Sequence, residues 1–253
     1  MTSSIGKQFM RETQIARLAE QSEQRRGLPQ PPLELAYPGG GQPIDLPEPE
    51  SLSLGSIPLI QAINARRTVR HYSAEPLSLG ELSFLLWCTQ GVEERTDRPA
   101  TLRPVPSAGA RHAFETIVLA NRVEGLPGGL YRFLAGEHRL APLPAPDDIT
   151  ARLTAACREQ DQVNASAATF IWVAVWACMR WRYGERGYRF LHLDAGHICQ
   201  NLYLAAEAVG CGVCAIGGFD DEALNRELGL DGEELFAVYL GTVGKKESHE
   251  PPR

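Results

Sequence analysis

The sequence predicts an α+β fold rather than a doubly wound parallel sheet. Helical and strand patterns alternate only imperfectly along the chain, and two expected strands, 115–121 and 129–134, follow each other across a turn region. The apolar run Phe170–Met179 is rich in β-forming residues, which indicates a buried strand. With 253 residues, of which 43% are hydrophobic, the chain is long enough to bury a large core.

The charge balance and the cysteine content narrow the class of protein. The chain has 25 Lys and Arg against 31 Asp and Glu, a net charge of −6, whereas nucleic-acid-binding proteins usually carry a basic face. No apolar stretch approaches the roughly 20 residues that span a bilayer, and residues 1–20 lack the apolar centre of a signal peptide. Six cysteines are too few for a disulfide scaffold. We therefore expect a cytoplasmic protein with no membrane or nucleic-acid partner.

Residues 1–56 are expected to form an N-terminal helix and a Pro/Gly-rich arm ahead of a main domain over 57–253. Residues 1–26 are polar with sparse apolar positions, which is typical of a single amphipathic helix. Segment 27–58 should be extended and irregular, because Pro removes backbone donors and Gly costs entropy. A disordered linker is the alternative. An arm packed on the surface is favoured because apolar residues recur along it: Leu33, Leu35, Tyr37, Ile44, Leu46, Leu52 and Leu54.

The remaining elements follow from capping signals and hydrophobic periodicity. The segment Ile57–Arg66 is expected to be helical, and the next helix, Ser78–Gly91, begins with Ser78 and Glu81 at the spacing of a capping box. Gly210 is expected to end a long apolar helix. The later elements are expected to be strands at 115–121 and 129–134, a helix at 146–160, a strand at 169–177, a helix at 190–209, a strand at 211–216, a helix at 220–228 and a strand at 235–243.

A cluster of positively charged residues follows the expected helix at 57–66. Arg66, Arg67 and Arg70 lie within five residues, together with the hydroxyl of Thr68. A guanidinium binds phosphate through a planar fork, and a threonine adds a short donor. In an acidic protein this cluster indicates a phosphate ligand, and a solvated charge run is the alternative.

Two segments of small residues suit a flat ligand that lies against the backbone. In Pro106–His112 the small residues are Ser107, Ala108, Gly109 and Ala110, and Ser107 adds a hydroxyl donor; a simple turn is the alternative. In Ile216–Phe219, Gly217 and Gly218 lie between an expected strand and an expected helix. The glycine-rich fingerprints of Rossmann and P-loop proteins are absent from the sequence.

For two further segments we favour a structural role over a catalytic or metal-binding one. Cys211 and Cys214 have the spacing of a redox dithiol or half a metal site, but no second Cys-x-x-Cys follows, so buried structural cysteines are preferred. The segment Arg180–Arg189 carries Tyr183, a candidate proton donor or acceptor, beside Arg182. From its chemistry alone it is expected to be a cationic loop over an aromatic-lined core.

Taken in order, these segments resemble the flavin-dependent nitroreductase superfamily, and specifically its SagB/ThcOx-type dehydrogenase branch. Each motif is modest, but the ordered set is specific, and the resemblance runs from about Leu33 to Lys246. The segments that carry it are Arg66–Tyr72, Leu85–Gly91, Pro106–His112, Arg182–Arg189 and Leu193–His197.

The resemblance implies an α+β fold with a mostly antiparallel sheet, a homodimer, and FMN at the dimer interface. The FMN phosphate and ribityl chain would be held by Arg66, Arg67, Thr68 and Arg70. The Pro-Ser segment of the other subunit, here Ser107, Ala108 and Gly109, would lie along the flavin. Gly217 and Gly218 match the stretch whose N–H faces flavin N5 or O4, and Lys245 or Lys246, preferably Lys246, matches a cation near the phosphate.

This sequence departs from the family pattern at two positions. Where many nitroreductases have an Asn in the Pro-Ser segment, this chain has Ala110, so one flavin-contacting amide is absent. Where azoline-oxidising members carry a catalytic Lys-Tyr pair, this chain has Arg182 and Tyr183. Arginine stays protonated and cannot act as a base, so Tyr183 remains the candidate proton relay of the implied catalytic pair.

The resemblance implies an FMN-dependent oxidoreductase that transfers a hydride through flavin N5. One direction reduces nitro or quinone-like acceptors with NAD(P)H, and the other dehydrogenates a peptide-like or heterocyclic substrate. A non-catalytic binding subunit of a peptide-modifying complex is the alternative class. A zinc or dithiol protein built on Cys211 and Cys214 is a third, and no metal site is expected.

Overall fold

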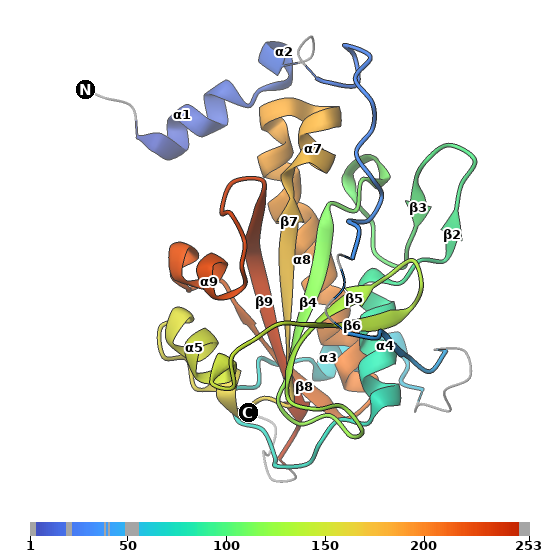
Figure 1. Cartoon of the computed structure of the whole chain (residues 1–253), viewed down its shortest axis with the longest axis vertical. Helices are drawn as coiled ribbons and strands as arrows, with labels where there is room; N and C mark the ends of the chain where they lie inside the picture. Colours follow the sequence, from blue (N-terminus) through green and yellow to red (C-terminus); the bar gives the residue numbers. More distant parts are fainter. Residues whose placement is uncertain (1–3, 19–21, 38, 40, 49–55, 248–253) are drawn as a thin grey trace.

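The computed structural model describes residues 4–18, 22–37, 39, 41–48 and 56–247. Its centre is a seven-stranded sheet in the order β1-β6-β5-β4-β7-β9-β8, and every neighbouring pair is antiparallel (Figure 1). The α+β prediction is therefore confirmed. The strands of this sheet are β1 (Ile44–Asp45), β4 (Phe114–Ala120), β5 (Gly129–Leu134), β6 (Arg139–Leu143), β7 (Ala168–Val175), β8 (Cys211–Ile216) and β9 (Leu235–Lys245).

Helices cover both faces of the sheet. On one face α8 packs against β8 and β9 and against its neighbours α3 and α4, and on the other face α5 packs against α9. The helices of the main body are α3 (Leu59–Ala65), α4 (Leu79–Gln90), α5 (Ile149–Ala156), α6 (Gln162–Ala165), α7 (Trp176–Tyr183), α8 (Gly187–Ala208) and α9 (Asp221–Glu227).

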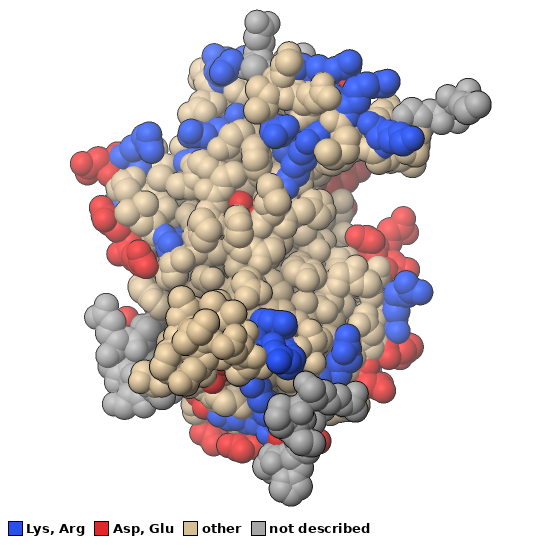
Figure 2. Space-filling view, turned by 180° about the vertical axis from the view of Figure 1, so that it is seen from behind, with Lys and Arg blue, Asp and Glu red and all other residues tan. Residues whose placement is uncertain are grey.

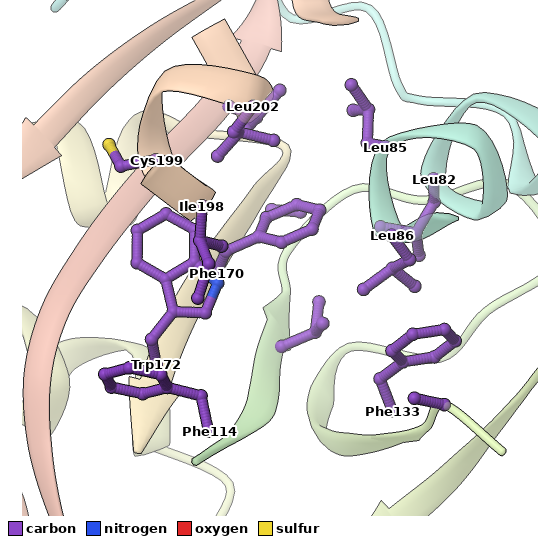
Figure 3. Close-up of a cluster of buried hydrophobic side chains, with 14 of the residues drawn as sticks. Leu82, Leu85, Leu86, Phe114, Phe133, Phe170, Trp172, Ile198, Cys199 and Leu202 are labelled. Atoms are coloured by element: carbon purple, nitrogen blue, oxygen red, sulfur yellow. The ribbon is translucent and has the colours of Figure 1, made fainter. Parts of the chain in front are cut away.

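Two cores lie on opposite faces of the same strands. Along β7, Phe170 and Trp172 join the larger core with α4 and α8, whereas Ile171 and Val173 join the smaller core with α5 and α9. This alternation follows from the two-residue period of a strand. Figure 3 shows the larger core, where Leu82, Leu85 and Leu86 of α4 face Ile198 and Leu202 of α8 around Phe170.

The capping signals act as the sequence predicts. Ser78 accepts a hydrogen bond from the Glu81 N–H, and the Glu81 carboxylate accepts one from the Ser78 N–H, which completes the capping box of α4. Asp220 caps α9 by accepting from the Ala223 N–H. Gly210 follows α8 with φ +67°, a conformation that glycine adopts without strain.

The apolar run at 170–179 is not one strand. β7 ends at Val175, and Trp176–Tyr183 forms α7, so the expected strand end at residue 177 is wrong, as is the expected loop at 180–189. Val175 is the last residue of β7 with a partner, Leu235 at the start of β9. Beyond that point no strand among the described residues pairs with the chain, which turns into a helix whose first N–H donates to the Glu234 carbonyl. The long helix also begins earlier than expected, at Gly187.

Three short strands and one longer one, β1, β2 (Glu94–Arg95), β3 (Thr101–Leu102) and β6, form where no strand is expected from the sequence. β6 contains Pro142, which weighs against a strand assignment, yet β1 pairs only with Leu140 and Arg139, so Pro142 has no strand on that side. A hairpin of β2 and β3 stands apart from the main sheet (Figure 1). The expected helix at 146–160 forms as α5 but is shorter, Ile149–Ala156, and a separate short helix, α6, follows it.

The N-terminal segment contains two short helices rather than one, α1 (Ile5–Glu12) and α2 (Ile15–Leu18). They are separated at Thr13, whose hydroxyl donates to the Phe9 carbonyl and ends the first helix. The arm that follows packs on the main body: Tyr37 donates to the Pro142 carbonyl at 2.7 Å, and Leu46 is buried. Leu52 and Leu54 lie outside the described residues.

Candidate active site

The arginine cluster lies along the edge of the sheet. β8 is an edge strand, and the segment after α3 runs parallel beside it: Val69 donates to the Val213 carbonyl at 2.9 Å. Gly212 makes this approach possible, because a Cβ there would lie 2.6 Å from the Val69 side chain. The edge pairing therefore fixes the backbone between Arg66 and Arg70.

Tyr203 of α8 joins the cluster to the strand. Its hydroxyl accepts from the Ala215 N–H at 3.0 Å and lies 3.2 Å from the Thr68 hydroxyl. The Arg66 guanidinium lies over the same ring, 5.2 Å from its centroid. Tyr203 thus orients Arg66 and Thr68 together.

The three guanidiniums of this cluster are free to bind an anion. Within residues 4–18, 22–37, 39, 41–48 and 56–247, no carboxylate forms an ion pair with Arg66, Arg67 or Arg70. Arg67 donates only to the backbone carbonyls of Asn64 and Arg66, at 2.8 Å each. Concentrated positive charge without a protein counter-charge is the electrostatic signature of a phosphate site.

Gly217 and Gly218 follow β8 at the same edge of the sheet and are both exposed. The Gly218 carbonyl accepts a hydrogen bond from the Gln160 side chain at 2.7 Å, which holds this turn against the α5–α6 connection. The neighbouring lysines are paired with carboxylates: Lys245 with Glu81, and Lys246 with Glu207 at 2.6 Å. Unlike the arginines, the two lysines therefore have protein partners.

The Ser107 loop is held by a buried carboxylate. The Ser107 hydroxyl donates to Asp194 of α8 at 2.6 Å and accepts from the His112 N–H at 2.9 Å. The Ala108 N–H also donates to Asp194, at 3.2 Å. Burial raises the pKa of Asp194, against the opposing effect of these hydrogen bonds. This network fixes the shape of the loop at the end of α8 away from Tyr203.

Gly109 brings two of the predicted segments together. It lies in a 3-10 turn, η2 (Ala108–Ala110), with φ +59°. A Cβ at this position would lie 2.6 Å from Arg182 Nε and closer still to the Tyr183 hydroxyl. Glycine is needed for both reasons. The loop backbone therefore lies directly against the Arg182–Tyr183 pair at the end of α7.

The Arg182–Tyr183 pair has an aromatic setting. The Arg182 guanidinium lies 5.7 Å from the centroid of the Tyr183 ring, and that ring lies 4.5 Å from the ring of Phe190. Next to it, Arg111 lies over Trp181 at 5.3 Å. Arg182 and Tyr183 are both partly exposed, so a ligand can reach them.

Within one chain the two halves of this site stay apart. The Ser107 loop contacts Asp194, and the arginine cluster contacts Tyr203, both on α8. At 1.5 Å per residue these contacts are about 14 Å apart along the helix axis. The structure therefore groups Ser107, Ala108 and Gly109 with Arg182 and Tyr183, and it groups Arg66, Thr68 and Arg70 with β8.

Sequence reasoning missed Asp194 and Tyr203, the two side chains that hold these groups. Asp194 carried a weak signal, since a buried acid in a mostly apolar helix needs a partner. Tyr203 carried none beyond its place in the same helix. Both act through contacts between segments far apart in sequence, which local spacing does not reveal.

The cysteine motif is structural. Cys211 and Cys214 are buried in β8, and burial raises the pKa of the Cys211 thiol to about 12 and also raises that of Cys214. A neutral buried thiol is neither a metal ligand nor a nucleophile. Across the part of the chain that the structure describes, no three His, Cys, Asp or Glu side chains are grouped to hold a metal ion, and no helix has the length and apolarity of a membrane span.

The chain belongs to the nitroreductase family, whose family model matches residues 63–245. It is 30% identical over 208 residues to a protein of Methanocaldococcus jannaschii described as a nitroreductase, covering 82% of this chain and 98% of that protein. It is also 28% identical over 155 residues to the trifolitoxin-processing protein TfxB of Rhizobium leguminosarum, covering 58% of this chain but only 40% of TfxB.

Solved structures agree with this assignment. A structure from Ralstonia eutropha described as a nitroreductase is 26% identical, with a TM-score of 0.67, and the match covers 88% of this chain and all of that one. Two more distant structures share the fold alone. The microcin synthetase complex McbBCD of Escherichia coli matches at 19% identity and TM-score 0.62, covering 85% of this chain and 78% of that one. A Desulfovibrio desulfuricans nitroreductase in complex with FMN matches at 21% and 0.53, covering 78% and 93%.

The superfamily and the fold expected from the sequence are thus confirmed, and the chain is a nitroreductase-family oxidoreductase. The family match contains every proposed site residue up to Lys245 and ends one residue before Lys246.

Proposed function

We propose that this protein is an FMN-dependent oxidoreductase whose cofactor phosphate is held by Arg66, Arg67 and Arg70. The observation that carries the proposal is the set of three guanidiniums at the edge of the sheet, none of which is paired with a carboxylate among the described residues. Thr68 adds a hydroxyl whose position Tyr203 sets.

The other residues of the candidate site are also suited to FMN. Gly217 and Gly218 expose backbone beside the cluster, where a flat ring can approach without meeting a side chain. FMN, when bound, supplies the hydride-transfer chemistry. The chain then has to bind the phosphate, shield the ring and place a substrate against it. Lys246 is paired with Glu207, so we assign it to the charge balance of this edge rather than to primary phosphate binding.

We further propose that the active unit is a homodimer. The arginine cluster and the Ser107 loop lie about 14 Å apart along α8 within one chain, so a second copy would have to bring Ser107, Ala108 and Gly109 to the cofactor. Exposed apolar side chains favour this arrangement: Leu59 and Ile63 of α3, which packs on α8, are 66% and 50% exposed, and Leu193 of α8 is 58% exposed. A dimer interface would cover them.

Two directions of electron flow remain open to this site. Reduction of a nitro or quinone-like acceptor with NAD(P)H needs little from the side chains beyond binding. Dehydrogenation of a peptide-like substrate needs a group that removes a proton, and Tyr183 is the side chain placed for this role beside Gly109. The similarity to TfxB and to the microcin synthetase fold favours this second direction and the SagB/ThcOx-type branch.

The first experiment measures FMN binding. The purified protein is expected to be yellow, or to take up added FMN with flavin absorbance in a one-to-one ratio. Replacing Arg67 with Gln should weaken FMN binding by about tenfold or more, because a charge-assisted hydrogen bond contributes about 1.5–3 kcal/mol. Arg226→Gln, at an exposed arginine beside Glu227, is the matched control. A colourless protein that takes up no FMN would refute the proposal.

Rapid mixing with NAD(P)H separates the two directions. Fast loss of the yellow colour supports the reductase, and its absence supports the dehydrogenase. Replacing Tyr183 with Phe should impair dehydrogenation far more than reduction, because only dehydrogenation needs the hydroxyl. Equal losses in both assays would remove Tyr183 from the role of proton relay. Six free cysteines agree with a reduced compartment, so we place the protein in the cytoplasm.

A further inference from the structure

A cavity of about 310 Å³ lies where the N-terminal segment meets α7 and α8. On the α7–α8 side it reaches the Arg182–Tyr183 pair, and on the other side it is closed by α2 and the turn at residues 22–27. Its lining consists of Ile15, Ser22, Gln24, Arg25, Arg182, Tyr183, Arg186 and Phe190.

Among the described residues that line this cavity, every charged side chain is an arginine. Arg25, Arg182 and Arg186 line it, and no carboxylate in the described part of the chain forms an ion pair with any of them. The contrast with Arg180 is informative, because this arginine, two residues before Arg182 on α7, is paired with both Glu23 and Glu234. Figure 2 shows Lys and Arg side chains gathered at the end of the molecule, at the top of the view, where α1, α2 and α7 lie.

One of these arginines has an unused buried donor. Arg186 donates from Nη1 to the Thr13 carbonyl at 2.9 Å, but its Nε is buried and has no hydrogen-bond partner. A buried guanidinium N–H without an acceptor costs free energy. Arg186 also contributes its positive charge to the lining of the cavity.

The other walls are apolar and aromatic. Arg186 lies over the Phe190 ring at 5.4 Å, and the Tyr183 and Phe190 rings are in contact. Ile15 adds an aliphatic side chain. The cavity therefore suits a flat or apolar body that carries a negatively charged group.

The chemistry of Arg182 also favours an anionic ligand. Because its guanidinium keeps its proton, it cannot take a proton from a substrate. What it offers instead is a fixed charge and a planar pair of donors, which match a carboxylate or phosphate. The Gly109 backbone on one side and the Tyr183 ring on the other hold it in place.

We propose that this cavity binds an oxyanion carried by an apolar or aromatic substrate, with Arg25 and Arg182 as the binding residues. The oxyanion is the carboxylate of an acidic substrate or the phosphate of a nicotinamide dinucleotide, since both present the same oxygens to a guanidinium. The identification of the ligand as a substrate rests on the proposed oxidoreductase function. The binding of the anion does not.

The test is a calorimetric titration of the protein as purified with three small aromatic probes: 4-nitrobenzoate, 4-nitrophenyl phosphate and the neutral 4-nitrobenzamide. At least one anion is expected to bind ten or more times more tightly than the amide. Tighter binding of the benzoate assigns the carboxylate, and tighter binding of the phosphate probe assigns a phosphate group. Equal affinity for all three probes would overturn the proposal.

The variants Arg25→Gln and Arg182→Gln should each lower the affinity for the favoured anion about tenfold and leave the amide within twofold. Arg182→Lys keeps the charge but loses the planar pair of donors, so its affinity for the anion should lie between those of the wild type and Arg182→Gln. Arg226→Gln, outside the cavity, is the control. If Arg182→Lys binds the anion as weakly as Arg182→Gln, or if neither glutamine variant differs from the control, the proposal is overturned.

Flavin content separates this proposal from the proposed function. Calorimetry reports anion binding whether or not FMN is present, and flavin absorbance of the same sample reports FMN. A colourless protein whose preference for the anions is lost in Arg25→Gln and Arg182→Gln would refute the FMN proposal and support the anion site in this cavity. A yellow protein that shows no preference would do the reverse.

Discussion

Replacing Gly109 with alanine is expected to push Tyr183 and Arg182 away from the Ser107 loop. The new Cβ would lie 2.6 Å from Arg182 Nε and closer to the Tyr183 hydroxyl. Ordinary contacts between heavy atoms are about 3.5–4.0 Å, so both side chains must move by about 1 Å. Both side chains are partly exposed and have room to shift, and we therefore expect the pair to move while the fold persists.

Two costs follow from this substitution, and a second variant separates them. The left-handed backbone at φ +59° costs alanine about 1–2 kcal/mol relative to glycine. Gly125 has a similar φ of +73°, but a Cβ there would meet nothing within 4 Å. Gly125→Ala therefore carries the backbone cost without the contact. Urea unfolding should show comparable losses of stability in the two variants.

Activity should distinguish the two variants. A displacement of about 1 Å at a catalytic position can reduce the rate by about 100-fold. Only Gly109→Ala should show such a loss, measured as quinone reduction by NAD(P)H or as dehydrogenation of the substrate, whichever the holoprotein performs. If Gly109→Ala turns over as fast as Gly125→Ala, the contact between the loop and the pair has no role in the reaction.

Three other substitutions test the supports of the site. Asp194→Ala should cost about 1–3 kcal/mol in urea unfolding, because the Ser107 hydroxyl and its neighbouring N–H lose their acceptor; Asp194→Asn should cost less, and equal costs would contradict this account. Burial and nearby arginines lower the pKa of His112 from 6.5 to about 3, so the unfolded chain takes up a proton that the folded protein does not. The contribution of His112 to the free energy of unfolding is fully present well above pH 6.5 and should fall by about 2 kcal/mol by pH 5. The His112→Asn variant should therefore lose less stability between pH 7 and 5 than the wild type, and an equal loss in the two proteins would refute the assignment. Tyr203→Phe should weaken FMN binding severalfold while Thr68 keeps its hydroxyl; unchanged flavin affinity would show that Tyr203 does not orient the cluster.

Several elements could be predicted because their signals are local. The capping box of Ser78 and Glu81 and the glycine after α8 act within a few residues, so the sequence pattern alone locates these helix ends. The apolar run after residue 169 could not be divided correctly, because β7 ends where β9 ceases to pair with it. A strand depends on a neighbour from elsewhere in the chain, and periodicity does not report that neighbour.

The candidate site divides in the same way. Arg66, Arg67 and Arg70 stand out in the sequence because three guanidiniums lie within five residues of an acidic chain. Their lack of carboxylate partners among the described residues, on which the proposed phosphate site rests, is visible only in the fold. The lysines show the difference: Lys246 looks equally available in the sequence but is paired with Glu207.

The sequence by itself determined the fold class, the basic segment after α3 and the presence of small residues at 107–109, since each depends on residue types close together along the chain. The tertiary structure alone decided that Gly109 lies against Tyr183, that Asp194 and Tyr203 hold the two halves of the site, and that Arg25 shares a cavity with Arg182. These contacts join segments separated by many residues. They arise only when packing against α8 and the sheet brings those segments together, because burial and charge pairing are properties of the folded surface.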